Sequence, residues 1–412
     1  MGKGTLNVDT SLASAKLLDK NSVLAIAKYH INNYMKNDSQ TKGKIITPSS
    51  DFINLYDLDD NLFAYMVPLL ENGNEIGYIT VGAIEDGFDT YSIYISDNYT
   101  SKVKAKIQQK KELISKTADS KLVFIPSLYY FIKVKDGQTE KYFDISQDIN
   151  NDIDATNNVI SKKEEIKKIY STIRSNENKT LLQKNIQSVT SASTSAQQLS
   201  ATVTVEDVRL VNEAQGSFVP VFYGTTTFYG GNQNWYSDST KRSRGCGPTA
   251  AANITNYLAK GYPYQWGKLY SQPSMYELDF IKHMDLMYGY LTPGVVGVVQ
   301  LSAFADGVEA WARFNNQPLS RVTFTDSLTQ DNMANFIKYG LIDDQPVATL
   351  NLQPPNTGYE YAWHWMTITK YFRDVNDNRF LAVSSWGTRY SINYYQHFNA
   401  INLYGGGNIY FQ

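Results

Sequence analysis

The chain has 412 residues, which is too long for one ordinary hydrophobic core and predicts two or three domains. It carries 38 basic and 40 acidic side chains, so its formal net charge is −2, and neither nucleic acid nor an anionic membrane is indicated as a partner. No apolar run reaches the roughly 18 residues that a membrane span needs. The first residues also lack the apolar core of a signal peptide.

The N-terminal part of the chain predicts a mixed domain of helices and strands. Apolar side chains recur at helical spacing over residues 22–36, with Asn21 or Ser22 as the expected cap. Apolar runs over 63–70 and 76–82 are joined by a segment with an Asn-Gly pair, which predicts a hairpin. Further elements are expected in chain order: strands over 91–95, 122–125 and 129–134, a solvated lysine-rich helix over 102–116, and a polar helical segment over 161–185.

A Ser/Thr-rich stretch from residue 188 divides the chain. It contains almost no large apolar side chains and cannot bury enough surface to fold alone, so we expect an exposed linker of the kind that proteases cut. All six tryptophans follow it, beginning with Trp235. We therefore expect an α+β domain at 1–187, a linker and processing region at 188–204, and a second domain at 205–412.

Cys246 is the only cysteine, so no intramolecular disulfide can form. It stands between two glycines and precedes Pro248 and a run of three alanines, a pattern that predicts the start of a helix. The N-terminus of a helix lowers a thiol pKa, and a histidine partner lowers it further. Cys246 is therefore a candidate nucleophile, whose own N–H group can stabilise an oxyanion. The alternative is a buried structural thiol.

His364 is the candidate base. It opens an alternating segment at 363–371 that predicts a strand, followed by a turn at 374–378 and a returning strand at 380–387. A base at the start of one strand can meet an orienting group at the end of its hairpin partner. The other three histidines are expected to be packing or surface residues: His30, His283 and His397.

Three separated motifs occur in a characteristic order. Gly-Cys-Gly-Pro-Thr at 245–249, His-Trp-Met at 364–366 and Ser-Ser-Trp-Gly at 384–387 resemble the papain-like cysteine peptidases, in the bacterial branch of streptopain-like and C39-like enzymes. The resemblance implies an α+β catalytic domain, in which a helix carrying the cysteine packs on an antiparallel sheet carrying the histidine. It also implies that Cys246 is the nucleophile and that His364 acts as base and then as acid.

The third catalytic residue departs from the family pattern. The family has Asn or Asp at the position of Ser384. A serine hydroxyl can accept a hydrogen bond from imidazole but carries no charge. Ser384 is the first candidate, Asn393 is an alternative, and the site can also work as a Cys-His dyad.

The oxyanion glutamine also departs from the pattern. In papain it stands six residues before the cysteine, and Thr240 occupies that position here. We choose Gln233 as the oxyanion residue, and Asn232 and Asn234 remain alternatives.

The N-terminal part has a looser resemblance of its own. Its helix and the segments at 55–69 and 77–82 are similar to the pro-regions of streptopain-like zymogens. The resemblance implies an intramolecular inhibitor at 1–187. We expect a secreted or cell-surface bacterial thiol endopeptidase, acting on protein or peptide substrates without cofactor or metal and activated by autocatalytic cleavage at the linker.

Two other functions stay open. The same fold can serve as an amidase or acyltransferase acting on cell-wall peptides or small conjugates. The chain can also be an inactive binding protein, in which Ser384 marks lost catalysis.

Overall fold

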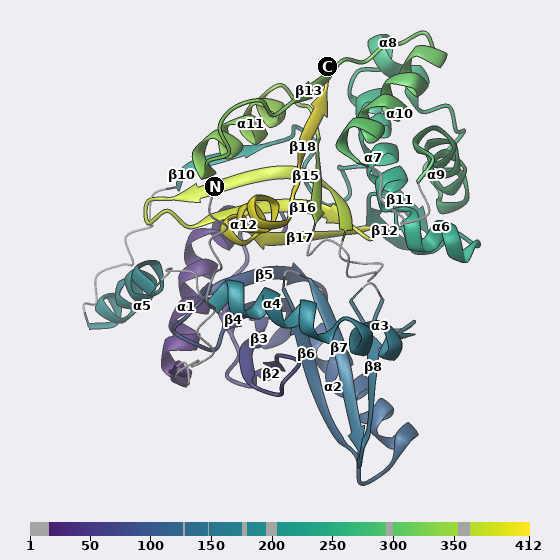
Figure 1. Ribbon diagram of the computed structural model, residues 1–412. Helices are drawn as coiled ribbons and strands as arrows, with labels where there is room; N and C mark the ends of the chain where they lie inside the picture. The colour runs from purple at the N-terminus through teal and green to yellow at the C-terminus, as the bar shows by residue number, and fades with distance from the viewer. Residues whose placement is uncertain are drawn as a thin grey trace, which may run out of the picture.

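A computed structural model describes residues 16–126, 128–146, 148–174, 179–194, 204–293, 300–352 and 363–412 (Figure 1). We call residues 16–194 the N-terminal half and residues 204–412 the C-terminal half. The described strands form one 16-stranded, mostly antiparallel sheet and a separate two-stranded sheet. The large sheet runs through both halves, and the expected α+β class is confirmed at this level.

The N-terminal half contains the first fifteen described elements in chain order. They are α1 (Lys20–Asn33), the 3₁₀ helix η1 (Met35–Asn37), β1 (Ile46–Pro48), β2 (Ile53–Tyr56), β3 (Leu62–Glu71), β4 (Asn74–Gly82), β5 (Thr90–Ile95), α2 (Tyr99–Ile114), β6 (Asp119–Ile125), β7 (Tyr129–Asp136), β8 (Thr139–Asp144), β9 (Ile153–Asp154), α3 (Thr156–Ser161) and α4 (Lys163–Arg174), followed by α5 (Lys179–Thr194).

The sequence patterns predicted the hairpin β3–β4 and the helix α1 close to their observed positions. The predicted hairpin is β3–β4, and its turn residues Asn72 and Gly73 have φ angles of 51° and 82°, the left-handed conformation that a two-residue hairpin turn requires. The first helix begins slightly earlier than predicted. Its cap is Asp19, whose carboxylate accepts a hydrogen bond from the Ser22 N–H at 2.8 Å, so the expected cap at Asn21 or Ser22 is wrong.

The segment expected as a linker is partly helical. Helix α5 continues to Thr194, and residues 195–203 lie outside the described residues. Leu182 and Asn185 are buried near α1, and the hydroxyl of Ser188 donates to the Lys184 carbonyl at 2.8 Å. Tertiary packing of this kind, rather than intrinsic propensity, provides most of the stability of helices in proteins. Composition alone therefore misplaced the start of the linker.

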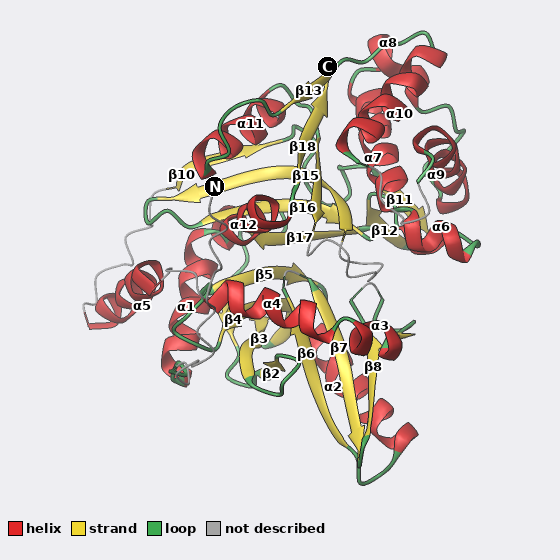
Figure 2. Cartoon of the chain, viewed as in Figure 1, coloured by secondary structure: helices red, strands yellow, loops and turns green. Residues whose placement is uncertain are grey.

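The C-terminal half contains the remaining elements. They are β10 (Thr204–Arg209), β11 (Pro220–Tyr223), β12 (Thr226–Tyr229), η2 (Gln233–Trp235), α6 (Ser239–Arg244), α7 (Cys246–Gly261), α8 (Pro263–Trp266), η3 (Gly267–Leu269), α9 (Glu277–Leu291), α10 (Leu301–Phe314), β13 (Arg321–Thr323), α11 (Gln330–Ile342), β14 (Val347–Leu352), β15 (Trp363–Asp374), β16 (Arg379–Ser385), β17 (Thr388–Asn393), α12 (Tyr394–Tyr404) and β18 (Gly406–Phe411). Helices α6 to α10 gather on one side, and strands β14 to β18 lie beside them (Figure 2).

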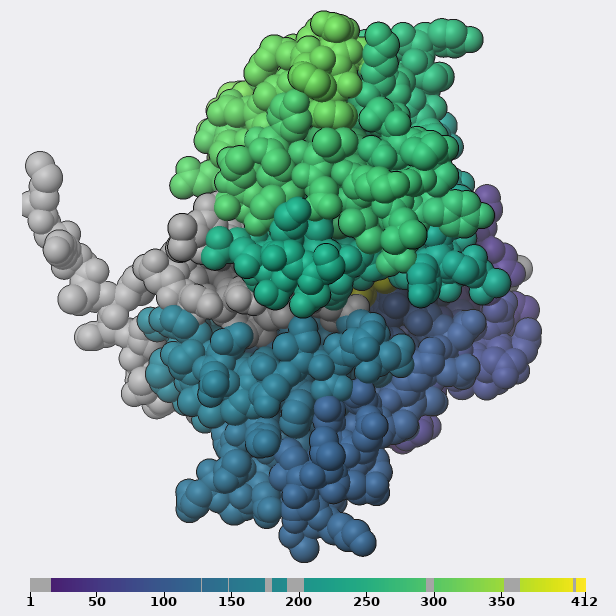
Figure 3. Space-filling view, turned by 90° about the vertical axis from the view of Figure 1, so that its right-hand side faces the viewer, coloured from purple at the N-terminus to yellow at the C-terminus, as the bar shows by residue number. Residues whose placement is uncertain are grey.

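The large sheet crosses from one half to the other at β5 and β17. These strands pair antiparallel, with Ser391 opposite Ile93. The strand order on either side of this pair is β13-β18-β14-β15-β16-β17 and β5-β4-β3-β2-β6-β7-β8-β9. In the space-filling view the blue N-terminal half lies below the green C-terminal helices, and a small yellow area of the C-terminal end of the chain is visible between them (Figure 3).

Candidate active site

Helix α7 carries the thiol at its first residue. Cys246 opens the helix, as predicted, and the helix is buried from Cys246 to Ala259 between the sheet and α9 and α10. The three alanines allow this close packing on all sides. Gly245 is required at the junction with α6, because a Cβ there would lie 2.6 Å from both the Lys241 carbonyl oxygen and the Tyr236 ring.

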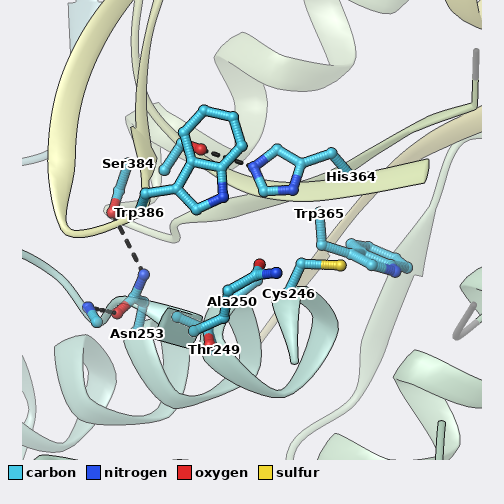
Figure 4. Close-up of a pocket in the computed structure, with 11 residues that line it drawn as sticks. Cys246, Thr249, Ala250, Asn253, His364, Trp365, Ser384 and Trp386 are labelled. Atoms are coloured by element: carbon cyan, nitrogen blue, oxygen red, sulfur yellow. Dashed lines mark hydrogen bonds between the residues drawn. The ribbon is translucent and has the colours of Figure 1, made fainter. Parts of the chain in front are cut away.

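His364 lies at the start of β15 and faces the same pocket as Cys246 (Figure 4). The predicted hairpin of β15 and β16 is present, with the turn at 374–378. The Nε2 atom of His364 lies 2.6 Å from Ser385 Oγ at the end of β16. The Trp386 indole stacks on the imidazole, with ring centroids 4.6 Å apart and planes inclined by 25°. Ser385 and Trp386 thus hold the imidazole from its edge and its face.

The Trp-Gly pair of the third motif is a hairpin turn. Trp386 and Gly387 connect β16 to β17, with φ angles of 50° and 71°. Two left-handed residues match the twist of the flanking strands. A non-glycine residue in this region is strained, and such strain often occurs at functional sites. In this chain the strained residue is the one that covers the imidazole.

Ser384 is not the residue that orients His364, so this expectation is wrong. Neighbouring residues of a strand point to opposite faces of the sheet, and Ser385 rather than Ser384 shares the face of His364. The Ser384 hydroxyl instead donates to the Tyr229 carbonyl at 2.6 Å. The alternative, Asn393, caps α12 through its carbonyl oxygen and donates to the Thr90 carbonyl at 2.8 Å.

Gln233 lines the pocket together with Cys246 and His364. Its side chain is buried, and its Nε2 donates to the Arg242 carbonyl at 2.8 Å. Asn232 instead caps η2 by accepting from the Asn234 N–H at 2.9 Å. Of the three amides predicted for the oxyanion position, only Gln233 is among the described residues that line the pocket.

Asn253 is a site residue that sequence reasoning missed. It lies about two helical turns after Cys246, so both side chains share one face of α7. Its Oδ1 accepts from the Gly231 N–H at 2.8 Å, and its Nδ2 donates to Ser384 Oγ at 3.3 Å. We call Gly231, Asn253, Ser384 and Tyr229 the clasp, because they fasten the Gln233 loop to α7 and β16. An amide seven residues after the cysteine, on the same face of the predicted helix, was the available signal.

The pocket is small in this structure. Its volume of about 10 Å³ holds about one water molecule. Burial raises the pKa of the Cys246 thiol, although backbone groups of Trp365, Gly247 and Cys246 oppose the shift. His364 is half-buried by surface area, but dense packing around the ring lowers its pKa to about 3. Burial therefore favours the uncharged forms of both the thiol and the imidazole in this structure.

The N-terminal half reaches the edge of the site. The ring of Tyr129, at the start of β7, meets the Trp386 indole edge-on, with centroids 5.7 Å apart. Trp386 therefore lies between the His364 imidazole and the N-terminal half.

The other three histidines are packing residues, as expected, but all three are buried. His283 lies 2.8 Å from the Thr255 hydroxyl, and His397 lies 3.0 Å from the Thr349 hydroxyl. His30 pairs with Asp89 at 3.1 Å. The surface option is therefore wrong for these histidines.

No protein-family model matches the chain, and no curated protein matches it. Across the described residues, no three His, Cys, Asp or Glu side chains gather in a group that could hold a metal ion. The helices in this part of the chain are all too short or too polar to cross a bilayer.

Proposed function

We propose that the chain is a papain-like cysteine endopeptidase made as a zymogen. One observation carries the proposal. A single pocket joins a thiol at a helix N-terminus, an imidazole held by Ser385 and Trp386, and the side chain of Gln233. Thiol, oriented base and oxyanion donor are the parts that acyl transfer through a thioester requires.

The hydrogen bond to Ser385 assigns roles to the two ring nitrogens. When Nε2–H donates to Ser385 Oγ, Nδ1 holds the lone pair, and Figure 4 shows this second nitrogen on the side of Cys246. Nδ1 takes the thiol proton, and the thiolate attacks the peptide carbonyl carbon. The Cys246 N–H and the Gln233 amide donate to the resulting oxyanion.

The imidazolium then completes the first half of the reaction. It gives its proton to the leaving amine, and the C–N bond breaks to leave a thioester on Cys246. His364 next takes a proton from water, which attacks the thioester and releases the carboxylic acid and the thiol. A neutral serine stabilises the imidazolium less than a carboxylate would, so the hydrogen bond contributes mainly orientation.

Latency is part of the proposal. The contact of Tyr129 with Trp386, which stacks on the His364 imidazole, supports an intramolecular inhibitor in the N-terminal half. Activation then requires a cut in the 188–204 region, and the described helix α5 moves the favoured position of that cut beyond Thr194. We propose a secreted or cell-surface location for the enzyme.

The test begins with purified intact chain. We expect incubation to give a C-terminal fragment, and the incubated protein to cleave an unfolded protein substrate and to bind a peptidyl chloromethyl ketone at Cys246. The Cys246→Ala and His364→Ala variants should show none of these three activities. A Cys246→Ala chain that still cuts itself at the same rate rules out autocatalysis.

The alternatives give different results in the same assay. A chain that labels but hydrolyses only cell-wall peptides or small amides is an amidase or acyltransferase. A cut chain whose thiol stays unlabelled is a binding protein.

A further inference from the structure

The surface where the two halves meet contains paired strands, buried ion pairs and a shared apolar cluster. We call it the junction: α1, η1, β5 and α5 of the N-terminal half against β15, β16 and β17 of the C-terminal half. We propose that the junction holds the two halves together as a two-chain complex after the chain is cut between residues 194 and 204. This inference does not rest on the proposed function, because none of the junction residues named below is among the described residues that line the pocket.

The junction first completes a sheet. Tyr94, Ile93 and Ser92 of β5 pair with Tyr390, Ser391 and Ile392 of β17. The Tyr94 and Tyr390 rings lie 4.9 Å apart, and Asn393 Nδ2 donates to the Thr90 carbonyl at 2.8 Å. Without β5, the buried strand β17 would present unpaired backbone groups at an open edge. Such edges are normally paired or covered.

Buried ion pairs cross the same surface. Asp38, just after η1, accepts from Arg389 through both carboxylate oxygens, at 3.1 and 2.8 Å, and from Lys370 at 3.1 Å. Arg389 and Lys370 are fully buried. Burial alone would raise the pKa of Asp38, but the charges of Arg389 and Lys370 outweigh burial and hold it well below its usual range.

These ion pairs join carboxylates from both halves around shared cations. Glu213 of the C-terminal half binds the other side of Arg389, with its Oε1 2.6 Å from Arg389 Nε. A forked, fully desolvated Arg–carboxylate pair is a strong and geometrically specific contact. Loss of one partner of such a pair mainly accelerates dissociation.

Aromatic side chains of the C-terminal half belong to the core of the N-terminal half. Phe372 and Phe380 are buried in a cluster whose other members come from the N-terminal half. Tyr34 of the η1 region packs on both, with ring centroids 5.1 and 4.7 Å away. Its hydroxyl lies 2.6 Å from the Ser391 hydroxyl. Separation would expose both phenylalanines to water.

A polar network closes the junction beside α5. Asn185 donates to Asp89 at 2.7 Å and to the Asn378 side chain at 2.9 Å. Tyr29 of α1 donates to Asp374 at 2.8 Å. All five side chains are buried. The helix that precedes the 195–203 segment is therefore itself part of the junction, and it stays with the N-terminal half after a cut.

The position of the cut decides the outcome. Every residue named in these contacts lies either before residue 194 or after residue 204, so cleavage between those positions removes none of the named contacts. For the proposed peptidase, cleavage alone then leaves Tyr129 against Trp386, and a second event must remove the N-terminal half.

The experiment uses the full chain with Cys246→Ala, so that its outcome is independent of catalysis. A site-specific protease sequence is inserted between Gln198 and Leu199, the chain is cut to completion, and size-exclusion chromatography follows at 0.1 and 1 M NaCl. We expect one peak at the position of the uncut chain, containing both fragments at equal amounts. Two separate peaks, or one fragment in solution with the other precipitated, overturn the proposal.

A matched pair of variants tests the assigned contacts. Asp38→Ala should raise the dissociation constant of the cut complex at least tenfold. Asp51→Ala should leave it unchanged, because Asp51 is 78% exposed and pairs only at the surface with Lys104. If uncut Asp38→Ala does not fold, Tyr34→Phe, which loses the bond to Ser391, replaces it and should still weaken the complex. An unchanged constant in the tested variant overturns the assignment of these contacts.

Discussion

Two adjacent serines provide the sharpest test of the site. Ser385 contacts the His364 imidazole at 2.6 Å, and Ser384 belongs to the clasp on the opposite face of β16. Ser385→Ala and Ser384→Ala remove the same atom from neighbouring positions. Their effects should nevertheless differ in kind, because only Ser385 contacts the base.

The structure sets the size of each effect. A hydrogen bond to a charged group contributes about 1.5–3 kcal/mol, and the imidazole is charged when the thiolate forms. Ser385→Ala should therefore lower kcat/KM by about 10- to 150-fold. Ser384→Ala leaves the buried Tyr229 carbonyl without this donor and should lower the free energy of unfolding by about 1–3 kcal/mol.

Peptide hydrolysis and urea unfolding, measured on the cut and activated enzyme, separate the two effects. Ser385→Ala should change the rate of hydrolysis much more than stability, and Ser385→Thr, which keeps the hydroxyl, should recover part of the rate. A large loss of kcat/KM in Ser384→Ala with near-normal Ser385→Ala would refute the assignment of the orienting residue.

Three further predictions concern the clasp, the neighbouring Gly230 and the buried His283. Asn253→Ala should lower kcat about tenfold or more, because it releases the Gln233 loop. The carboxymethylation rate of Cys246 needs no oxyanion donor and should stay within about twofold, so equal losses of both rates would contradict the positioning role of Asn253. Gly230→Ala should destabilise the fold by more than about 2 kcal/mol in thermal unfolding, because Gly230 has a φ of +85° and a Cβ there would lie 2.6 Å from Ser384 Oγ. Gly224→Ala is the control: Gly224 has a φ of +56° with no atom within 4 Å of the added Cβ, so the variant should lose only about 1–2 kcal/mol. Burial lowers the pKa of His283 to about 3, whereas the unfolded chain has a histidine pKa of about 6.5. Below pH 6.5 the unfolded state therefore binds a proton that the folded state does not, and the free energy of unfolding falls as the pH drops. His283→Gln should reduce the difference in this free energy between pH 6.5 and 5 by about 2 kcal/mol in urea titrations, and an unchanged difference would contradict the prediction.

Signals confined to a short stretch of sequence were sufficient for part of the fold. The Asn-Gly turn of β3–β4 and the glycine-flanked start of α7 each depend on neighbouring residues, and both lie where predicted. The predicted start of the linker at residue 188 was wrong, because it depends on contacts between segments that are far apart in sequence. Helix α5 runs on into the Ser/Thr-rich segment, and its buried residues Leu182 and Asn185 pack near α1, a helix distant in sequence that composition does not reveal.

The errors at the site follow from the period of a strand. A shift of one residue moves a side chain to the other face of the sheet, so Ser384 and Ser385 exchange roles although the motif itself is located correctly. The pairing of β5 with β17 could not be predicted from the sequence either. Its register depends on two strands that lie far apart in sequence, and Asp38, Lys370 and Arg389 become partners only after those strands pair.

The hairpin of β16 and β17 links the site to the junction. Ser385 ends β16 beside the imidazole, the Trp386-Gly387 turn covers that ring, and β17 begins the contact with β5. The Gly387 carbonyl also accepts from the Tyr229 N–H at 2.8 Å, which connects the turn to the clasp. Because packed interiors transmit displacement, a shift of β5 against β17 would reach the His364 imidazole through this turn, and the contact of Tyr129 with Trp386 gives a second connection. The N-terminal half can therefore influence the position of the His364 ring through Trp386.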